Sequence, residues 1–232
     1  MEVESLEAIP YALPFREPYV TARGELSERE LVLVRVRAEG LIGLGESAAL
    51  SLRGGVGIET ICEQVEGVCR EALRDGGFDP ARIWSSIARC RGRGASAPAL
   101  AALDIALHDL AARAQGVPLW RLLGAQSARP VECNATLPAA NPAPLRALAE
   151  RWAVDGFSTF KLKVGMAGDV AQVAALREML GPEARLRVDA NGSWAPADAA
   201  ERLRALARHR IELAEEPVSG LADLAALRRE TD

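Results

Sequence analysis

From about residue 130 onward, the chain alternates between short apolar segments and longer segments with a helical repeat of apolar residues. The short segments have the alternation and β-branched content of strands. Because parallel strands need a crossover connection, the alternation predicts a parallel sheet covered by helices. No G-x-G-x-x-G turn opens a unit, so the pattern favours a (β/α) barrel over a dinucleotide-binding fold. The expected strands are 131–137, 158–164, 185–191 and 211–217, and the expected helices are 142–156, 169–181, 195–209 and 221–230.

The number of units is too small for a closed barrel. A barrel of this class needs eight strands and typically about 250 residues, whereas this part of the 232-residue chain holds only four units. A half barrel would leave two unpaired parallel edges and an uncovered apolar face. We therefore expect the chain to be a C-terminally truncated piece of a longer protein. The alternative is an open α/β sheet of four strands that is complete in itself.

Residues 1–125 have a different pattern, which predicts an α+β domain before the incomplete barrel at residues 126–232. The overall fold class is then α/β. A hairpin turn is expected at 38–40, and the segment 13–30, which contains prolines and shows no clear period, is expected to be a loop. Small residues at 96–116 predict a helix that packs tightly. The expected strands are 3–11, 30–38 and 41–47, and the expected helices are 57–73, 79–90 (with Asp79 as N-cap) and 96–116.

The composition argues against several classes of partner. The net charge is −4, apolar residues make up 49% and no basic stripe stands out, so we expect a packed core and no nucleic-acid partner. Charged residues interrupt every apolar stretch, which predicts no membrane span. The acidic N-terminus lacks the apolar region of a secretory signal, and the expected location is the cytoplasm.

Polar residues occur near the end of every strand predicted after residue 130. In a (β/α) barrel the chemistry lies at the carboxyl ends of the strands. Matched positions in successive units therefore indicate one shared site rather than scattered surface charge. The residues, in strand order, are Asn134 and Thr136, Lys161 and Lys163, Asp189 and Asn191, and Glu215 and Glu216.

The segment "TFKLKVG" (159–165) places two lysines on one face of a strand, because side chains on a strand repeat every two residues. Phe160, Leu162 and Val164 are then expected to face the covering helices. Two neighbouring ammonium groups repel each other, which makes Lys163 easier to deprotonate and suits it to act as a base. Taken alone, the lysines could equally be half-exposed surface residues.

Asp189 and Glu215 lie one β-α unit apart, so their carboxylates are expected on adjacent strand ends. Two carboxylates at such a short distance repel each other unless a cation lies between them, and Mg²⁺ prefers oxygen ligands of this kind. Each carboxylate also has a simpler explanation. Asp189 could belong to a turn before Asn191, and Glu215 could be a solvated loop charge.

The chain resembles the enolase superfamily, in particular its muconate lactonizing enzyme subgroup. The resemblance covers the whole chain and rests on motifs that occur in the order of that family. It implies a capping α+β domain followed by the start of a (β/α)₇β barrel of the TIM type. The matching segments are "GLGES" (43–47), "ALAALDIALHDLAARAQGVPLWRLLG" (99–124), "FKLKVG" (160–165), "VDANGSW" (188–194) and "AEEPV" (214–218).

The resemblance also implies roles for single residues. Lys163 matches the general base, and Lys161 matches the lysine that assists it. Asp189 and Glu215 match two of three ligands of Mg²⁺, which Mn²⁺ could replace. The third ligand and a lysine on the opposite face of the substrate are expected beyond Asp232. Contacts with the substrate or beside the metal are assigned to Asn191, Asn134 and Glu216, and loops at 14–24 and 50–57 are expected to close over the substrate.

The implied chemistry is removal of a proton α to the carboxylate of a small-molecule substrate. Our first expectation is a Mg²⁺-dependent lyase that eliminates water, similar to o-succinylbenzoate synthase of menaquinone biosynthesis. The alternatives are a dipeptide epimerase or a muconate cycloisomerase-like isomerase. An inactive fragment or remnant is the alternative from another class. The apolar capping domain is compatible with a homo-oligomer.

Overall fold

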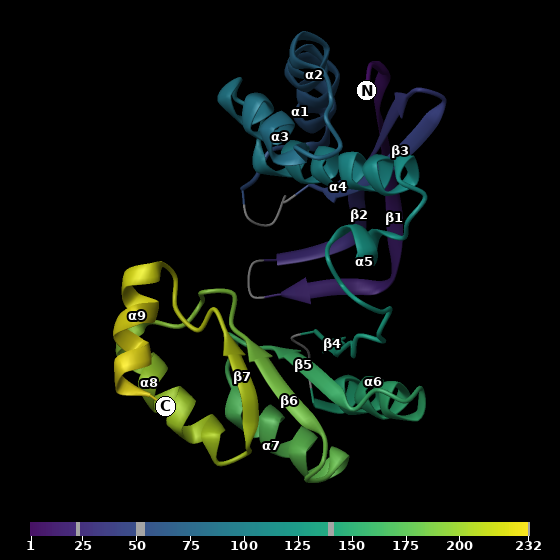
Figure 1. Ribbon diagram of the computed structural model, residues 1–232. Helices are drawn as coiled ribbons and strands as arrows, with labels where there is room; N and C mark the ends of the chain where they lie inside the picture. Colours follow the sequence, from purple (N-terminus) through teal and green to yellow (C-terminus); the bar gives the residue numbers. More distant parts are fainter. Residues whose placement is uncertain (22–23, 50–53, 139–141, 232) are drawn as a thin grey trace. The chain divides into compact units, whose positions relative to one another are not determined.

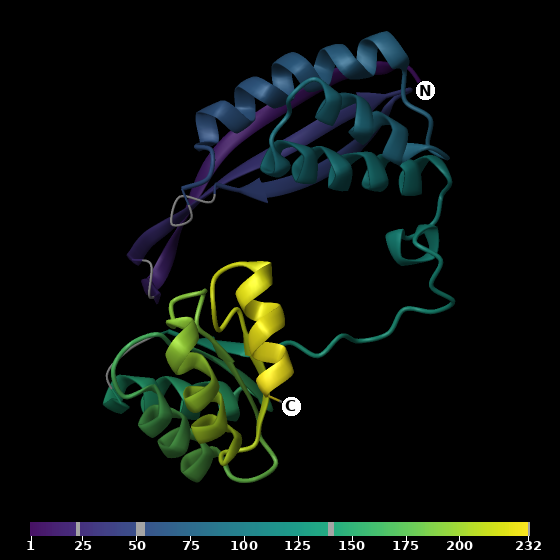
Figure 2. The ribbon, with the colours of Figure 1, turned by 90° about the vertical axis from the view of Figure 1, so that its left-hand side faces the viewer.

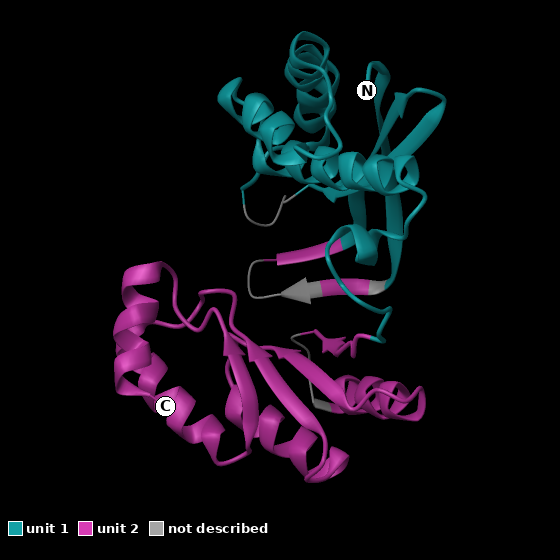
Figure 3. Ribbon diagram, viewed as in Figure 1, with its two compact units in different colours: residues 1–17, 27–130 teal, residues 18–26, 131–232 magenta. Residues whose placement is uncertain are grey.

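The computed structural model of the chain describes residues 1–21, 24–49, 54–138 and 142–231 (Figure 1). The described chain forms two compact units, which are coloured separately in Figure 3. Unit 1 holds residues 1–17 and 27–130, and unit 2 holds residues 18–26 and 131–232. The fold class predicted from the sequence is confirmed, because an α+β region precedes a parallel sheet of the α/β type. The predicted domain boundary after residue 125 stays a prediction.

A sheet with the order β1-β2-β3 forms the first layer of the fold; its strands are β1 (Val3–Thr21), β2 (Gly24–Ala38) and β3 (Leu41–Ala48). β2 pairs with β3 in an antiparallel register from Ala38 opposite Leu41 to Leu31 opposite Ala48. The turn between these strands is the predicted one at 38–40. Glu39 and Gly40 both have positive φ, at 51° and 74°, which is the backbone of a tight two-residue hairpin.

The predicted loop at 13–30 is wrong, because β1 and β2 continue through this segment up to residues 22–23, which lie outside the described residues. Pro14 and Pro18 caused the error, since proline is usually excluded from strands, whereas Pro10 already lies in the predicted strand 3–11. All three sit in β1, which is an edge strand of the sheet. Their spacing of four places them on the same side of the strand, so they can face the open edge, where no N–H donor is needed.

The predicted helices of unit 1 are present, with one start moved. The first helical stretch is continuous and contains a π-helical segment, η2 (Val65–Cys69). α3 begins at Ile83 rather than at Asp79. The Asp79 carboxylate instead accepts a hydrogen bond from the N–H of Ala81 and closes a turn before the helix. The helical elements are α1 (Ile58–Gln64), η2, α2 (Arg70–Gly76), α3 (Ile83–Gly92), α4 (Ala97–Ala114) and α5 (Leu119–Leu122).

α4 packs directly on the backbone of β3. A Cβ atom added to Gly43 would lie 2.2 Å from the carbonyl oxygen of Ala106, and one added to Gly45 would lie 2.0 Å from that of Ala102. The glycines of "GLGES" therefore allow a helix with small side chains to approach the strand closely, as the alanine-rich sequence predicted. The segment is part of a strand and serves packing.

The four-stranded sheet of unit 2 is parallel and has the order β4-β5-β6-β7, so each strand lies beside its neighbour in sequence (Figure 1). Its strands are β4 (Ala135–Leu137), β5 (Thr159–Lys163), β6 (Arg185–Asp189) and β7 (Ile211–Glu215). Its helices are α6 (Pro142–Val154), α7 (Asp169–Leu180), α8 (Pro196–Ala207) and α9 (Leu221–Glu230). Figure 2 shows these helices beside the strands of the same unit. β4 is shorter than the predicted strand 131–137.

One face of the parallel sheet is apolar and is covered by the helices. Phe160, Leu162 and Val164 are buried in a core with Leu176 of α7 and Leu206 of α8. The prediction that these residues of the lysine segment face the helices is confirmed. Among the helices in the described part of the chain, none combines the length and the apolar character that a membrane span requires.

Arg177 of α7 binds the turns at the amino ends of the strands β6 and β7, at the edge of the sheet opposite the predicted site. Its guanidinium donates to the carbonyl oxygens of Ala184, Gly181, His209 and Arg210 at 2.7, 2.8, 2.9 and 3.0 Å. The single side chain therefore joins the turn before β6 to the turn before β7. Burial and the neighbouring Arg210 lower the pKa of Arg177 below its ordinary value. Sequence analysis did not identify this residue, because its partners are backbone groups that the sequence does not label.

Replacing Arg177 with methionine is expected to lower the free energy of unfolding by about 2 kcal/mol, because several carbonyl groups lose their donor. Arg177→Lys should recover only part of the loss, since an ammonium group lacks the planar fork of donors. Arg204→Met, on the exposed side of α8, is the matched control and should change stability by less than about 0.5 kcal/mol. Urea titration followed by circular dichroism measures all of them. Equal stability of Arg177→Met and the control would contradict this role.

Candidate active site

The strand register brings the predicted residues of three strands into one row. Lys163 lies opposite Asp189 in the β5–β6 pair, and Asp189 lies opposite Glu215 in the β6–β7 pair. All three are the last residues of their strands. Because the strands are parallel, these ends meet at the same edge of the sheet, on the face away from the helices. Lys161 lies on the same face, two residues earlier.

The side chains in this row are in direct contact. Lys163 Nζ lies 2.6 Å from Asp189 Oδ2 and donates to Asn191 Oδ1 at 3.1 Å. Lys161 Nζ lies 2.9 Å from Asp189 Oδ2 and 2.7 Å from Glu215 Oε2. Asp189 is only 1% exposed, whereas the Glu215 side chain is 45% exposed. The cluster therefore has a buried centre at Asp189 and opens to solvent at Glu215.

The charges of the cluster shift the pKa values of its members. Burial acts to raise the pKa of Asp189, but hydrogen bonds from Lys163, Lys161 and the Asn191 N–H lower it below its ordinary value. Burial acts to lower the pKa of Lys161, but ion pairs with Glu215 and Asp189 outweigh it and raise the pKa. At Lys161, attraction to two carboxylates thus outweighs the effect of burial.

The loops after β6 and β7 hold each other by backbone contacts. The N–H of Gly192 donates to the carbonyl oxygen of Glu216 at 2.6 Å, and Ser193 forms an antiparallel bridge with Val218. Asn191 and Glu216 have positive φ, at 49° and 40°, a conformation that costs free energy for residues other than glycine. The Asn191 side chain points into the cluster, where its Oδ1 accepts a hydrogen bond from Lys163. Its position beside a metal stays a prediction. The side chain of Glu216 is exposed.

Asn134 is not at a strand end. The predicted strand 131–137 reduces to β4, and Asn134 precedes it. Thr136 lies opposite Lys161 in the register, so Asn134 is displaced toward the amino ends of the strands, and its side chain donates to Thr136 Oγ1 at 3.2 Å. Asn134 therefore lies apart from the row of Lys163, Asp189 and Glu215. The predicted loop at 14–24 is wrong for residues 14–21 and 24, which belong to β1 and β2. Residues 22–23 of this loop and residues 50–53 of the predicted loop 50–57 lie outside the described residues.

Asp169 is a residue of this region that sequence analysis missed. It is 3% exposed and begins α7, and its carboxylate accepts hydrogen bonds from the N–H groups of Gly165 and Met166. Arg202 of α8 approaches the same carboxylate to 3.6 Å. The loop that follows Lys163 is therefore fixed by a buried charge. Its signal in the sequence is an aspartate at the start of a helix, directly after the glycine-containing loop "GMAG".

The donor set fits a divalent cation in part. Asp189 Oδ2 and Glu215 Oε2 both converge on one cationic atom, Lys161 Nζ, at 2.9 and 2.7 Å. Two carboxylate oxygens that already share a cation are suitable ligands for Mg²⁺, which takes a few carboxylates together with water and substrate oxygens. Within the described ranges, no group of three or more His, Cys, Asp and Glu side chains is arranged to hold a metal.

The pH dependence of stability should reveal the Asp189 cluster in metal-free buffer. Because the folded-state pKa of Asp189 is lowered, its contribution is present above its unfolded-state pKa of about 3.9 and is lost as pH falls through the folded-state value. Wild type should therefore lose more stability than Asp189→Asn between about pH 5 and pH 2. Urea titrations at each pH measure the difference. Parallel curves for the two proteins would contradict the ion pairs.

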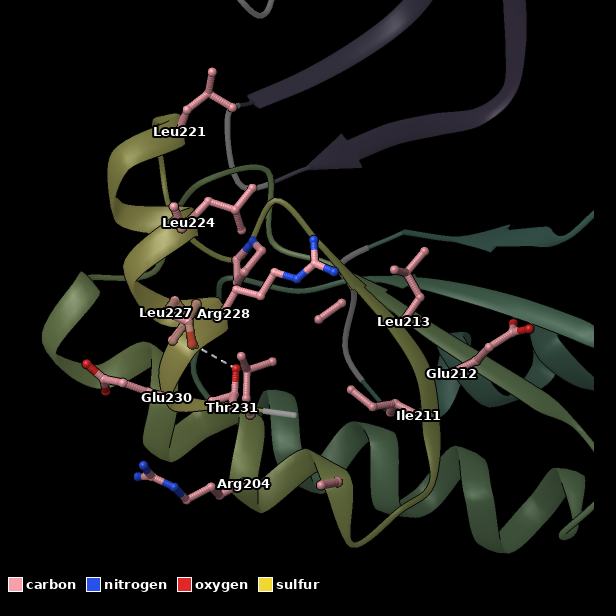
Figure 4. A pocket seen from close by; sticks show the side chains of 15 residues that line it. Arg204, Ile211, Glu212, Leu213, Leu221, Leu224, Leu227, Arg228, Glu230 and Thr231 are labelled. Atoms are coloured by element: carbon pink, nitrogen blue, oxygen red, sulfur yellow. Dashed lines mark hydrogen bonds between the residues drawn. The ribbon is translucent and has the colours of Figure 1, made fainter.

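A groove of about 900 Å³ lies between α8, β7 and α9 (Figure 4). It runs along β7, the last strand of the sheet order, and includes Leu213, Leu221 and Leu224. None of the residues predicted for the site lines it. The lining is mainly apolar and includes the charged residues Arg204, Arg228, Glu212 and Glu230.

Models of two protein families match the chain. The N-terminal domain of mandelate racemase / muconate lactonizing enzyme matches residues 6–124, and the enolase C-terminal domain-like family matches residues 144–232. The second match includes Lys161, Lys163, Asp189 and Glu215. Together the matches cover both compact units.

Curated relatives and solved structures agree with these families. The hydrophobic dipeptide epimerase of Enterococcus faecalis is 33% identical over 94% of this chain and 62% of its own length. The chloromuconate cycloisomerase of Cupriavidus pinatubonensis is 30% identical over 100% of this chain and 64% of its own length. The crystal structure of a dipeptide epimerase from Enterococcus faecalis, complexed with Mg and the dipeptide L-Leu-L-Tyr, superposes with a TM-score of 0.92 and 31% identity, over 100% of this chain and 66% of that one.

The chain thus spans somewhat under two thirds of the length of these relatives. The family matches, the parallel sheet and the row of lysines and carboxylates at its strand ends lead to the same assignment. The chain belongs to the mandelate racemase / muconate lactonizing enzyme group of the enolase superfamily.

Proposed function

We propose that Lys163 removes the proton α to the carboxylate of a small substrate, in a Mg²⁺-dependent reaction catalysed by the protein to which this chain belongs. The observation that carries the proposal is the row formed by Lys163, Asp189 and Glu215 at adjacent ends of parallel strands. A base next to two convergent carboxylates suits a reaction that develops negative charge beside a metal. The solved epimerase structure contains Mg and a dipeptide, which supports this choice of metal and substrate class.

Asp189 and Glu215 would hold the metal. A bound Mg²⁺ would supply Lewis-acid stabilisation of the charge that develops on the substrate carboxylate as the α-proton leaves. Lys161, which spans the two carboxylates in this structure, then becomes available to donate to a substrate oxygen. Lys163 keeps its contact with Asn191, which orients Nζ, while the buried Asp169 fixes the loop behind it.

We propose epimerisation of a dipeptide as the reaction. The support comes from the hydrophobic dipeptide epimerase and the solved dipeptide epimerase complex described above. A muconate-type cycloisomerisation is the second candidate, because a chloromuconate cycloisomerase matches the whole chain at 30% identity. The dehydrating lyase of menaquinone biosynthesis, which the sequence first suggested, gains no support from these relatives and stays a prediction.

A product assay separates these reactions. The natural gene product is incubated with Mg²⁺ and, in separate samples, with L-Ala-L-Glu, L-Leu-L-Tyr and cis,cis-muconate, and chiral chromatography follows the products. Epimerisation of a dipeptide, lost on addition of EDTA, is the expected result. Conversion of muconate alone would favour the cycloisomerase. No turnover of any substrate, in a folded sample that binds Mg²⁺, would favour the inactive remnant.

A further inference from the structure

Two thiols of unit 1, Cys69 and Cys90, lie together in the hydrophobic core. Cys69 ends the π-helical segment η2, and Cys90 lies in the last turn of α3; both are 0% exposed. The Cys90 thiol donates to the carbonyl oxygen of Cys69, with Sγ 4.0 Å from the oxygen. Both are free cysteines in the structure. The pair lies in a different unit from the candidate active site, and the proposed function does not use it.

Two arginines of α3 fix the helices in the position that brings the thiols together. Arg89 donates to the carbonyl oxygen of Gly77 at 2.6 Å and to that of Ala72 at 3.4 Å. Arg93 donates to Asp75 Oδ2 at 2.8 Å. Residues 69 and 72 are three apart, so they share a helix face, and residues 89 and 90 are consecutive. The contacts of the arginines therefore support, independently of the Cys90 contact, the packing of α3 against the helical stretch of η2 and α2.

The surroundings make the two thiols unequal. A hydrogen bond from the Cys69 thiol lowers the pKa of Cys90, against the effect of burial, and the charges of Arg89 and Arg93 act in the same direction. The same hydrogen bond together with burial raises the pKa of Cys69. Cys90 is thus the thiol that ionises first, and the thiolate is the nucleophilic form of cysteine. Cys69 keeps its proton and is the second reactant. The π-helical segment that ends at Cys69 is a form of helix often found at functional sites.

We propose that Cys69 and Cys90 are a redox-active pair that a hydroperoxide converts into a disulfide between η2 and α3. Because both thiols are 0% exposed, the first step takes place when the packing of α3 against η2 opens locally and admits the peroxide. The Cys90 thiolate then attacks the peroxide, an S–O bond forms, the O–O bond breaks, and the released hydroxide takes up a proton. In the second step the sulfur of Cys69 attacks the Cys90 sulfur, the S–S bond forms, and the S–O bond breaks. The departing hydroxide receives the Cys69 proton. Two thiols are oxidised by two electrons, and hydrogen peroxide is reduced to two molecules of water.

The bond would join residues that are far apart in the unfolded chain. Closing a loop between positions 69 and 90 restricts the unfolded state, so the oxidised protein unfolds at a higher temperature. It also locks α3 to the helical stretch that carries Cys69, which is part of the capping region. Oxidation of this pair can therefore be measured as a rise in the melting temperature, and the measurement does not depend on catalytic activity.

The test uses the purified chain and two internal comparisons. Folded protein is treated with increasing hydrogen peroxide, quenched, unfolded and alkylated, and its peptides are analysed by mass spectrometry. Cys133 is exposed, so its oxidation shows that the peroxide is active in the sample. Cys62 is half-buried on the same helical stretch as Cys69 and is the internal comparison for a cysteine outside the pair. The expected product is a peptide pair linked through Cys69 and Cys90, with an intact mass lower by two hydrogens. Dithiothreitol should reverse it, and the linked form should melt several degrees higher.

Variants separate the pair from general oxidation. Cys62→Ser should form the same link in the same amount, and Cys69→Ser should abolish it. If the Ser variant at position 69 does not fold, the wild-type peptide map alone still decides. Recovery of both Cys69 and Cys90 as alkylated free thiols, in wild-type samples whose Cys133 is fully oxidised, would overturn the proposal. A link between Cys133 and either residue in place of the Cys69–Cys90 link would overturn it as well.

Discussion

Replacing Lys163 with alanine is expected to reduce the rate of α-proton exchange by roughly a thousandfold, in line with the removal of a general base. The affected substrate is the stereoisomer whose α-proton faces Lys163. Binding of Mg²⁺ should change little, because the two proposed ligands, Asp189 and Glu215, are retained. Exchange in D₂O is followed by proton NMR, and Mg²⁺ binding by calorimetry. The variant therefore separates the base from the metal ligands.

The complementary variant tests that separation. Asp189→Asn should weaken Mg²⁺ binding and exchange together, since Asp189 is both a proposed ligand and the partner of the two lysines. Arg146→Ala, on the exposed face of α6, is the control and should leave exchange unchanged. Retained exchange in Lys163→Ala, with Mg²⁺ bound, would remove Lys163 from the role of base. Loss of Mg²⁺ binding in the same variant would mean that Lys163 acts through the metal site instead.

Replacing Gly45 with alanine is expected to lower the free energy of unfolding by about 3 kcal/mol or more, because overpacking against rigid backbone cannot be relieved by a side-chain rotation. The added Cβ would lie 2.0 Å from the carbonyl oxygen of Ala102 and 2.5 Å from the N atom of Ala106. These atoms belong to the hydrogen-bonded backbone of α4. The helix would have to move away from β3, which would open the core of unit 1.

Gly67→Ala is the matched control for this prediction. Gly67 lies in a helical segment with no atom within 4 Å of an added Cβ, and its φ is not positive. Alanine at such a position should keep stability or raise it by up to about 1 kcal/mol. Thermal melts of both variants decide the comparison. A Gly45→Ala protein as stable as wild type would contradict the close packing of α4 on β3.

Much of the site could be predicted from sequence because parallel strands repeat one geometry. Lys163, Asp189 and Glu215 end successive strands, and the parallel register places successive strand ends side by side. The helix-covered face could be predicted for the same reason, since Phe160 and Leu162 alternate with the lysines. Asn134 was misplaced because β4 is short, and a strand of three residues leaves almost no periodic signal.

Other features depend on contacts that a single sequence does not record. The length of β1 was missed because Pro14 and Pro18 indicate a loop in the sequence, and only the edge position in the sheet makes them compatible with a strand. Arg177 and Asp169 bind backbone groups, and the sequence does not indicate which backbone groups a side chain will contact. The direction of the pKa of Lys161 likewise requires the distances, because burial and the two carboxylates act on it in opposite directions.

We propose that the row of Lys163, Asp189 and Glu215 supports Mg²⁺-dependent removal of an α-proton. The most direct measurement is deuterium incorporation at the α-carbon of a dipeptide such as L-Leu-L-Tyr in D₂O, with the natural gene product at saturating Mg²⁺ and again after EDTA. We expect incorporation that requires Mg²⁺ and that disappears in Lys163→Ala for the stereoisomer whose α-proton faces Lys163. Incorporation that is equal with and without Mg²⁺, or that persists in Lys163→Ala for both stereoisomers, would contradict the proposal.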